Sequence, residues 1–416
     1  MNKSSLLKKL GPGLLYAGAA IGVSHLVQST RAGASFGISM LLVVVVANFL
    51  KYPFFQYGPR YTAATGKSLL HGYKKLGNWA VWLFLLLTIG TMFIIQAAIT
   101  MVTAGLAKYV THSDFDIWIW MILITAAAMG ILALGKLHVL DKLMKVIMVV
   151  LAVTTIAAAT ASFFAHVPKE TLSVQFNFSN SKHLFFLIAF IGWMPAPIDI
   201  SVWYSVWSEE KDKSNDSDTT TTLKNSLFDF SVGYWGTAFL ALCFVILGAQ
   251  MLHNSGTELS ASAVVFSGQI IEAYTNALGN WAIPIISIAA FTTMFSTTLS
   301  VMDGLSKVMT STVSILKEEE KEINEISSYR VWLGILGVGA LLVIWQFGSN
   351  MKTLIDFATT LSFLTAPILA YLNIRVMESK TIKGEYSPSK FTRVISYIGL
   401  LTLILFSIAF IVIRFF

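Results

Sequence analysis

Two stretches of glycine and proline interrupt apolar segments that are long enough to cross a membrane. The first runs from Gly11 through Gly22 to His25, and the second is Gly-Trp-Met-Pro-Ala-Pro at 192–197. A helix in lipid must satisfy its own backbone, so such interruptions are tolerated where the freed carbonyl and amide groups line a polar cavity. Half-helix ends carry partial charges that suit ions or polar solutes. Paired interruptions in two halves of a chain therefore predict a substrate site between two broken helices.

The side chains at the two breaks include an imidazole and a thioether, those of His25 and Met194. Gly22, Ser24 and Ala196 lie beside them in the two stretches and complete the candidate substrate-binding set. Backbone carbonyls of the breaks are expected to contribute to the site.

The second break also frees carbonyl groups and is followed by a carboxylate. Pro195 and Pro197 lack an N–H, which frees the carbonyls one turn earlier, near Ile191 and Trp193. Asp199 follows in the inner half of the same span and is the candidate acid of the site. The alternative is that Asp199 caps the half-helix that restarts after the break.

Ionisable residues inside apolar spans are functional candidates, because their burial in lipid is costly. Lys51 lies deep in the second span, far from water for its ammonium, and we expect it to pair with Asp199 or Asp303. One face of the eighth span carries a polar stripe at helical spacing, made of Thr292, Ser296, Ser300, Asp303 and Lys307. We expect an i,i+4 ion pair between Asp303 and Lys307. The stripe is either a packing face or the wall of an ion path.

The composition predicts an integral membrane protein. The chain is 55% hydrophobic and 12% charged, about half the charged share of a soluble protein. Apolar runs of about 20 residues recur along its length. We therefore predict a single all-α transmembrane domain, residues 1–416. Its eleven spans lie near 11–32, 37–59, 79–107, 116–135, 142–165, 183–207, 223–251, 281–306, 329–347, 353–374 and 392–413.

The distribution of positive charge predicts the orientation. With the N-terminus inside, 22 of the 29 lysine and arginine residues fall on the inner side and six on the outer side. This bias predicts a multi-pass protein of the plasma or inner membrane, with the N-terminus cytoplasmic and the C-terminus extracytoplasmic.

The same distribution limits the classes of partner. The net charge of +7 resides in the loops, which argues against a nucleic-acid partner. The expected partners are the lipid bilayer and a small-molecule or metal-ion substrate. The sequence leaves the oligomeric state open and is compatible with a monomer. It has no nucleophile–base arrangement and implies no cofactor, so we do not expect an enzyme.

Three segments carry a resemblance to a known family. The stretch GPGLLYAGAAIGVSHLVQSTRAGASFG at 11–37 resembles the first span of the Nramp family of divalent-metal transporters. ATGKSL at 64–69 resembles the loop after that family's second span, and WMPAP at 193–197 resembles the Met-Pro-His segment of its sixth span. With the eleven spans and their orientation, the resemblance covers essentially the whole chain.

The resemblance implies an architecture and a mode of action. The implied fold is a LeuT-type inverted 5+5 repeat in which helices 1 and 6 are broken. The repeats would span about 11–165 and about 183–374, followed by an extra helix at about 392–413. The implied activity is secondary transport of a divalent metal ion.

The departures from the family pattern fall on the implied metal site. The positions of the metal-motif Asp and Asn are occupied by Gly22 and His25, whereas Met194 matches the family's Met ligand. The substitution removes the only anion from the implied site, and a dehydrated divalent cation among neutral ligands is costly in a low dielectric. The ligands of the implied metal would then be His25 and Met194, a pair that suits a soft or borderline transition metal better than Mg²⁺.

The implied proton pathway departs in the same way. Ala196 and Ser201 stand where the family has two histidines in its sixth span. The third span has no acid, and Gln96 is its nearest polar substitute. Proton coupling would then be weak or absent, or carried by Asp199 or Asp303.

Two functional hypotheses follow. The first is a secondary transporter that works by alternating access and carries a divalent transition metal through a remodelled site between broken helices 1 and 6. In the second, the same scaffold carries a small polar or zwitterionic solute, or acts as a sensor, and does not transport divalent metal. A neutral site suits the second kind of substrate better.

Overall fold

The computed structural model describes residues 11–135, 137–165, 176–214, 222–253, 255–317, 325–348 and 350–415. The N-terminal basic segment and the centres of two charged loops, 215–221 and 318–324, lie outside these ranges. The helices are α2 (Pro12–Ala20), η1 (Gly22–Ser29), α3 (Thr30–Phe36), η2 (Gly37–Ser39), α4 (Met40–Thr65), α5 (Leu69–Leu76), α6 (Asn78–Val110), α7 (Ile117–Ala133), α8 (Leu137–Ala161), α9 (Ser181–Gly192), α10 (Ile200–Ser214), α11 (Leu223–Leu247), η3 (Gly248–His253), α12 (Ala263–Leu278), η4 (Asn280–Ala282), α13 (Ile283–Lys317), α14 (Glu325–Phe347), α15 (Met351–Met377), η5 (Gly384–Tyr386) and α16 (Lys390–Phe415).

The apolar segments of the sequence form helices in the predicted places. Seven stretches are long and apolar enough to cross a membrane, and Ile117–Ala133, Met148–Ala161 and Ser181–Gly192 are shorter apolar helices. One of the seven, Pro12–Thr65, reverses at Gly37, whose φ of +65° is accessible to glycine at little cost, and so supplies two spans. The described residues thus confirm the all-helical fold class.

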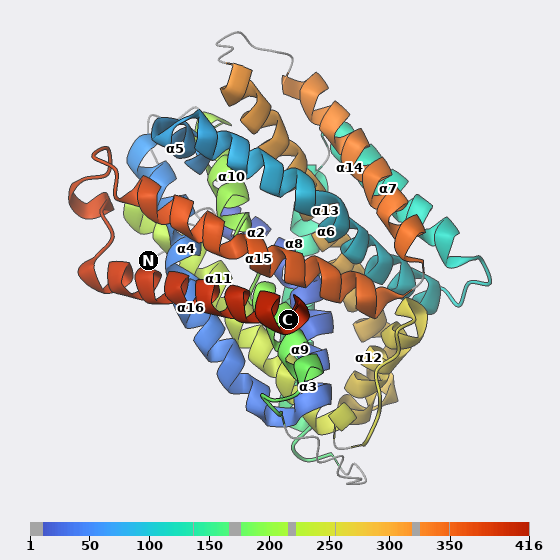
Figure 1. Cartoon of the computed structure of the whole chain (residues 1–416). Coiled ribbons are helices and arrows are strands. Elements are labelled where there is room, and N and C mark those ends of the chain that lie inside the picture. The colour runs from blue at the N-terminus through green and yellow to red at the C-terminus, as the bar shows by residue number, and fades with distance from the viewer. Residues whose placement is uncertain are drawn as a thin grey trace, which may run out of the picture.

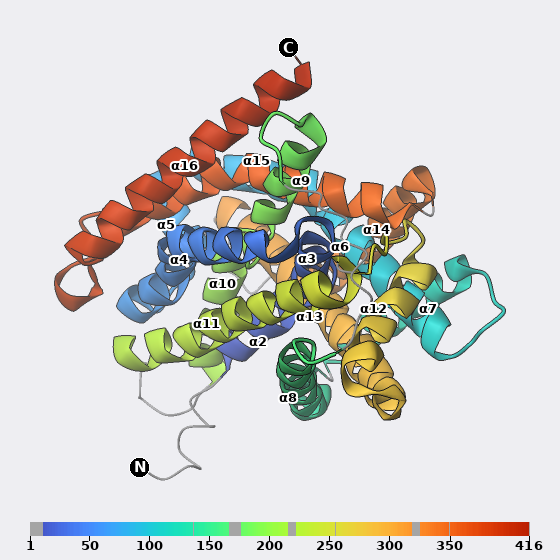
Figure 2. The ribbon, with the colours of Figure 1, turned by 90° about the horizontal axis from the view of Figure 1, so that it is seen from below.

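The helices differ in how far they are buried. In the apolar window of α13, 72% of the residues are buried, but in that of α16 only 17% are. Figures 1 and 2 agree that α2, α10 and α13 lie in the middle of the bundle and that α16 lies along its outside, against α4 and α15. Large apolar side chains on α16, such as Leu401 and Leu405, are exposed on this outer face. An exposed apolar face of this extent suits contact with lipid chains.

The two breaks have different backbone conformations. The sixth span is interrupted by residues 193–199, which are not helical and separate α9 from α10. The first span has only a one-residue interruption, at Ile21, where α2 gives way to η1, a π-helix. A π-helical turn leaves carbonyl groups without their i+4 partners, and such turns are frequent at functional sites.

Candidate substrate site

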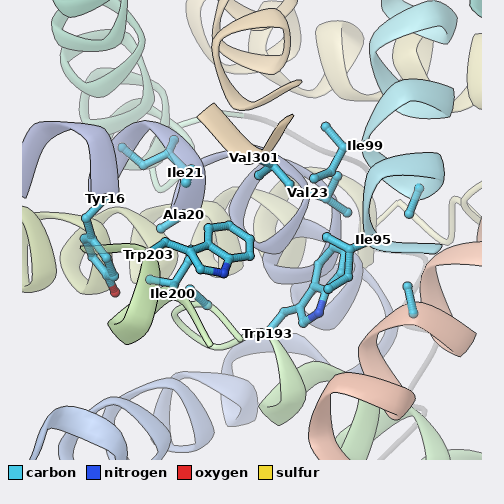
Figure 3. Packing of buried hydrophobic residues seen from close by; sticks show 14 of the residues in the cluster. Tyr16, Ala20, Ile21, Val23, Ile95, Ile99, Trp193, Ile200, Trp203 and Val301 are labelled. Atoms are coloured by element: carbon cyan, nitrogen blue, oxygen red, sulfur yellow. The ribbon is translucent and has the colours of Figure 1, made fainter. Parts of the chain in front are cut away.

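A small cavity lies between the two breaks. The first span, α6, the 193–199 segment with α10, and α13 contribute to its wall, and no charged side chain lines it. Its lining residues are Ala19, Val23, Ser24, Ile95, Ile99, Trp193, Ala196, Pro197, Ile200, Trp203, Thr297 and Val301. Figure 3 shows the indole rings of Trp193 and Trp203 with Val23, Ile95 and Val301 around them. The cavity predicted between the broken helices therefore has a largely apolar and aromatic wall.

The two tryptophans differ in their hydrogen bonding. The Trp193 indole N–H donates to Ser362 Oγ at 2.9 Å. The Trp203 indole N–H is buried and has no partner among the described residues. A buried donor without a partner is costly, so an acceptor on a bound solute would relieve that cost.

The first break has no room for an acidic side chain at Gly22. A Cβ atom added there would lie 2.5 Å from both Thr297 Oγ1 and Cγ2. Thr297 is held in place because its hydroxyl donates to the Gly18 carbonyl at 2.8 Å. The glycine at the position of the implied metal-binding Asp is therefore packed against a neighbouring helix.

His25 is fully buried and lies between two carbonyl oxygens. Its Nδ1 is 2.7 Å from the Ala20 oxygen and 2.8 Å from Ser24 Oγ, and its Nε2 is 2.9 Å from the Thr237 oxygen. A metal ligand must direct a ring lone pair at the ion. In this arrangement both ring nitrogens face protein acceptors, and His25 does not line the cavity.

Met194 lies in an apolar cluster. Its side chain is fully buried in a group that also includes Phe36, Met40, Phe190 and Val245. Among the described residues there is no group of three or more histidine, cysteine or acidic side chains that could hold a metal ion. The metal-ligand roles predicted for His25 and Met194 stay predictions, and the two side chains have different neighbours in this structure.

Lys51 of α4 reaches the second break. Its residue exposure is 2%, and its Nζ donates to the carbonyl oxygens of Ile191 at 3.1 Å, Gly192 at 3.1 Å and Ala196 at 2.9 Å. The ammonium therefore binds carbonyl oxygens at the break, whereas the sequence led us to expect a direct ion pair with an aspartate. Asp199 is close enough to act electrostatically on Lys51 without such a pair.

Asp199 is buried at the end of the second break. Its Oδ1 has no hydrogen-bond partner among the described residues, and its carboxylate accepts the backbone N–H of Ile200 at the start of α10. It lines a second small cavity with four hydroxyl-bearing residues, Thr88, Thr91, Ser362 and Thr365. This position is compatible with both predicted roles, the cap of a half-helix and a polar site.

The remaining candidates for coupling have local partners. Gln96 donates to Thr100 Oγ1 at 3.2 Å, and Ser201 Oγ accepts from Asn373 at 2.9 Å. The predicted pair of Lys307 with Asp303 is confirmed, with a distance of 3.3 Å. Asp303 also accepts from Trp207 and Tyr329, both at 2.9 Å. These contacts describe a polar network, and they leave the coupling roles untested.

Polar contacts join the first span to other helices at both of its ends. At one end Arg31 forms a two-pronged contact with Asp356 of α15, at 2.7 and 3.1 Å. At the other end the carboxylate of Asp229 in α11 accepts the backbone N–H groups of Gly11 at 3.0 Å and Gly13 at 2.8 Å. The cavity thus lies between two sets of interhelical contacts.

Sequence reasoning missed several residues of the cavity. Trp203 and Thr297 were not singled out, and neither was the apolar pair Ile95 and Ile99. For Trp203 a signal was available, since tryptophan in membrane proteins prefers the interface and two of them flank the break in mid-span. For Thr297 no signal was available, because its role depends on how α13 packs against the first span.

Comparison with known proteins decides the family. Residues 13–413 match the family described as Nramp, natural resistance-associated macrophage protein-like. The chain belongs to the Nramp family. An uncharacterised protein of Pasteurella multocida is 33% identical over 407 residues, which are 97% of this chain and 91% of that protein.

Solved structures place this Nramp chain among transporters of the LeuT-type fold. A manganese transporter of Eremococcus coleocola, solved with an aromatic bis-isothiourea substituted compound, aligns with a TM-score of 0.70 at 15% identity. The alignment covers 97% of this chain and 86% of that one. MhsT in complex with L-phenylalanine aligns with a TM-score of 0.63 at 17% identity and covers 95% of this chain and 98% of that one. The Nramp scaffold of an integral membrane transporter is therefore shared, and at these identities the likeness concerns the fold.

Proposed function

We propose that this Nramp-family chain is a secondary transporter that works by alternating access and carries a small organic solute, uncharged or zwitterionic, with an apolar portion. The observation that supports the proposal is the uncharged, aromatic wall of the cavity between the breaks. Binding pockets for small organic molecules are mostly apolar, with a few placed polar groups. Here those groups are the Trp203 indole N–H and the hydroxyls of Ser24 and Thr297.

Two features of the site argue against a divalent cation. The carbonyl oxygens at the second break already accept three hydrogen bonds from the Lys51 ammonium. Gly22 cannot be exchanged for an acid without displacing Thr297. A divalent ion in the cavity would find no carboxylate among the lining residues and would be repelled by the ammonium. The fold does not by itself require a metal substrate, since MhsT has the same fold and is described with L-phenylalanine.

The interhelical contacts at the two ends of the first span support alternating access. The Arg31–Asp356 pair joins that span to α15, and the contact of the Asp229 carboxylate with Gly13 joins it to α11. Breaking one set while keeping the other would open the cavity toward one side only. Rocking of broken helices against a fixed site is the usual basis of alternating access in inverted-repeat transporters.

A divalent transition metal remains the second candidate function. The family membership and the manganese transporters of the same fold favour it, and Met194 matches the family's thioether. Under this hypothesis His25 must rotate away from Ala20 and Thr237 to offer a ring nitrogen to the ion.

Binding to the purified full-length protein tests the proposal. Trp193 and Trp203 both line the cavity, so a bound solute should change the tryptophan fluorescence. We expect saturable changes with at least one member of a panel of L-valine, L-leucine, L-phenylalanine and uracil, and at least tenfold weaker binding in Trp203→Ala. Trp79→Ala is the matched control, because Trp79 is exposed on α6. Binding that is unchanged in Trp203→Ala would place the solute elsewhere and overturn the proposal.

A further inference from the structure

The break in the sixth span presents backbone carbonyl groups that would attract a cation. Ile191 and Gly192 belong to the last turn of α9, where carbonyl groups carry the negative end of the helix dipole. Pro195 has no N–H with which to continue the helical bonding to Ile191, and the Ile191 carbonyl accepts the Met194 N–H at 3.2 Å instead. Carbonyl groups at such breaks coordinate cations in transporters with discontinuous helices.

The Lys51 ammonium matches this set of carbonyls in number and in charge. An ammonium has three N–H donors and no acceptor, and the three carbonyl oxygens lie 2.9 to 3.1 Å from Nζ. The side chain also passes the ring of Phe55, whose centroid is 5.8 Å from Nζ. Every donor of the buried charge is therefore satisfied by the break itself.

Asp199 supplies the opposite charge without a direct contact. It lies at the start of α10, on the other side of the break from Ile191 and Gly192, and acts electrostatically on Lys51. The break thus brings together one basic and one acidic side chain, and when both are ionised it needs no further ion for neutrality.

We propose that the ammonium of Lys51 is a built-in cation that takes the place of a bound ion at the break of the sixth span. It holds α9 and the 193–199 segment together, as a coordinated ion would, but it is attached to α4 and cannot leave. The carbonyl groups are then closed to metal and alkali ions. This inference deepens the proposed function. It rests on that function for one consequence only, namely that the substrate is not a metal ion.

Replacing the lysine should convert the break into a cation site. Lys51→Met keeps the length of the side chain and removes the charge and the donors. The full-length variant is unfolded by heat in a choline buffer and again with K⁺, Na⁺ or methylammonium at the same ionic strength. We expect a lowered Tm in choline and a saturable rise of several degrees with at least one of the three cations, because a ligand of the folded state stabilises it. Wild type and Lys75→Met, altered at an exposed lysine of α5, should show no such rise.

A second variant separates charge from hydrogen bonding. Lys51→Gln keeps two N–H donors for the carbonyls but carries no charge, and it serves also if Lys51→Met cannot be purified. Under the proposal it responds to cations as Lys51→Met does. A Lys51→Gln protein with the Tm of wild type and no cation response would show that the lysine acts only as a hydrogen-bond donor, and it would overturn the proposal.

The experiment uses no organic solute, so its outcome is separate from that of the proposed function. A cation response in the variants together with no solute binding by wild type would keep the built-in cation and reject the solute. Saturable Mn²⁺ binding at the break in wild type, with Lys51 present, would contradict the built-in cation directly.

Discussion

At the scale of single residues, Gly22 stands where the resemblance implies a metal-binding acid. The space that such a side chain would need is filled by Thr297. The change is therefore part of the packing between η1 and α13. A sequence comparison can report the missing acid, but it cannot report what fills the space.

Two neighbouring glycines give a matched test of this packing. A Cβ atom at Gly22 would lie 2.5 Å from Thr297, whereas at Gly18 the nearest atoms, in Ser296 and Ser300, are 3.5 Å away. We expect Gly22→Ala to destabilise the protein by about 1–3 kcal/mol through overpacking and Gly18→Ala to have little effect. Thermal unfolding measures both. Adding Thr297→Ala should restore the stability of Gly22→Ala, and equal stabilities of the two single variants would contradict the account.

His25 provides a second prediction at this scale. Its ring lies between the carbonyl groups of Ala20 and Thr237 and thus connects the first break to α11. We expect His25→Ala to lower the free energy of unfolding by about 2–4 kcal/mol, because removing the ring leaves a cavity and takes the N–H donor from one of the two carbonyls. Denaturant unfolding checks this value. If the variant is as stable as wild type, the His25 ring contributes little to packing, and this outcome would instead favour a role of His25 in binding a ligand.

At the scale of the elements, the apolar pattern was sufficient to predict the spans but not their internal geometry. Segments such as 79–107 and 223–251 are helical as predicted because their length and composition allow nothing else in lipid. The π-helical form of the first break was not predictable, since glycine permits several backbone conformations without selecting one. The hydrogen-bond partners of Lys51 were not predicted either. The sequence suggests acidic side chains as partners for a buried lysine, but it does not show which backbone carbonyl groups a broken helix exposes.

The Arg31–Asp356 contact provides a prediction about opening. Asp356 has 40% side-chain exposure, so the pair contributes about 1 kcal/mol or less to stability. It also joins α3 to α15 at one end of the cavity, and its loss should favour opening there. A cysteine at Val23, which lines the cavity, in a Cys243→Ala background should react faster with an impermeant thiol reagent added outside when Arg31→Ala is present. No change in rate would exclude this contact as a gate.

At the scale of the whole molecule, the burial pattern agrees with a bundle in a bilayer, with α13 inside and α16 exposed. The orientation stays a prediction from the 22 positive residues on one side. Cysteines at Lys213 and at Ser255, each in a Cys243→Ala background, should be labelled from opposite sides, the first from the cytoplasm and the second from outside. Labelling of both from the same side would refute the eleven-span topology.

The sequence predicted where the candidate site would lie, but it predicted only some of the residues that line the cavity there. The two breaks, Ser24 and Ala196 do border the cavity, because glycine and proline mark interruptions reliably. His25 and Met194 lie outside its wall. Side chains point in all directions around a helix. A residue that lies in a break therefore does not necessarily face the cavity.

Calorimetric titration of the purified protein is the most direct test of the central claim that the break carries its own cation and the cavity takes an organic solute. Mn²⁺, Zn²⁺ and Mg²⁺ are titrated alongside L-valine, L-leucine, L-phenylalanine and uracil. The account predicts no saturable heat with any of the metals and saturable binding of at least one organic solute, weakened at least tenfold in Trp203→Ala. Saturable Mn²⁺ or Zn²⁺ binding that His25→Ala or Met194→Ala weakens more than tenfold would contradict it, and the remodelled metal site would then stand.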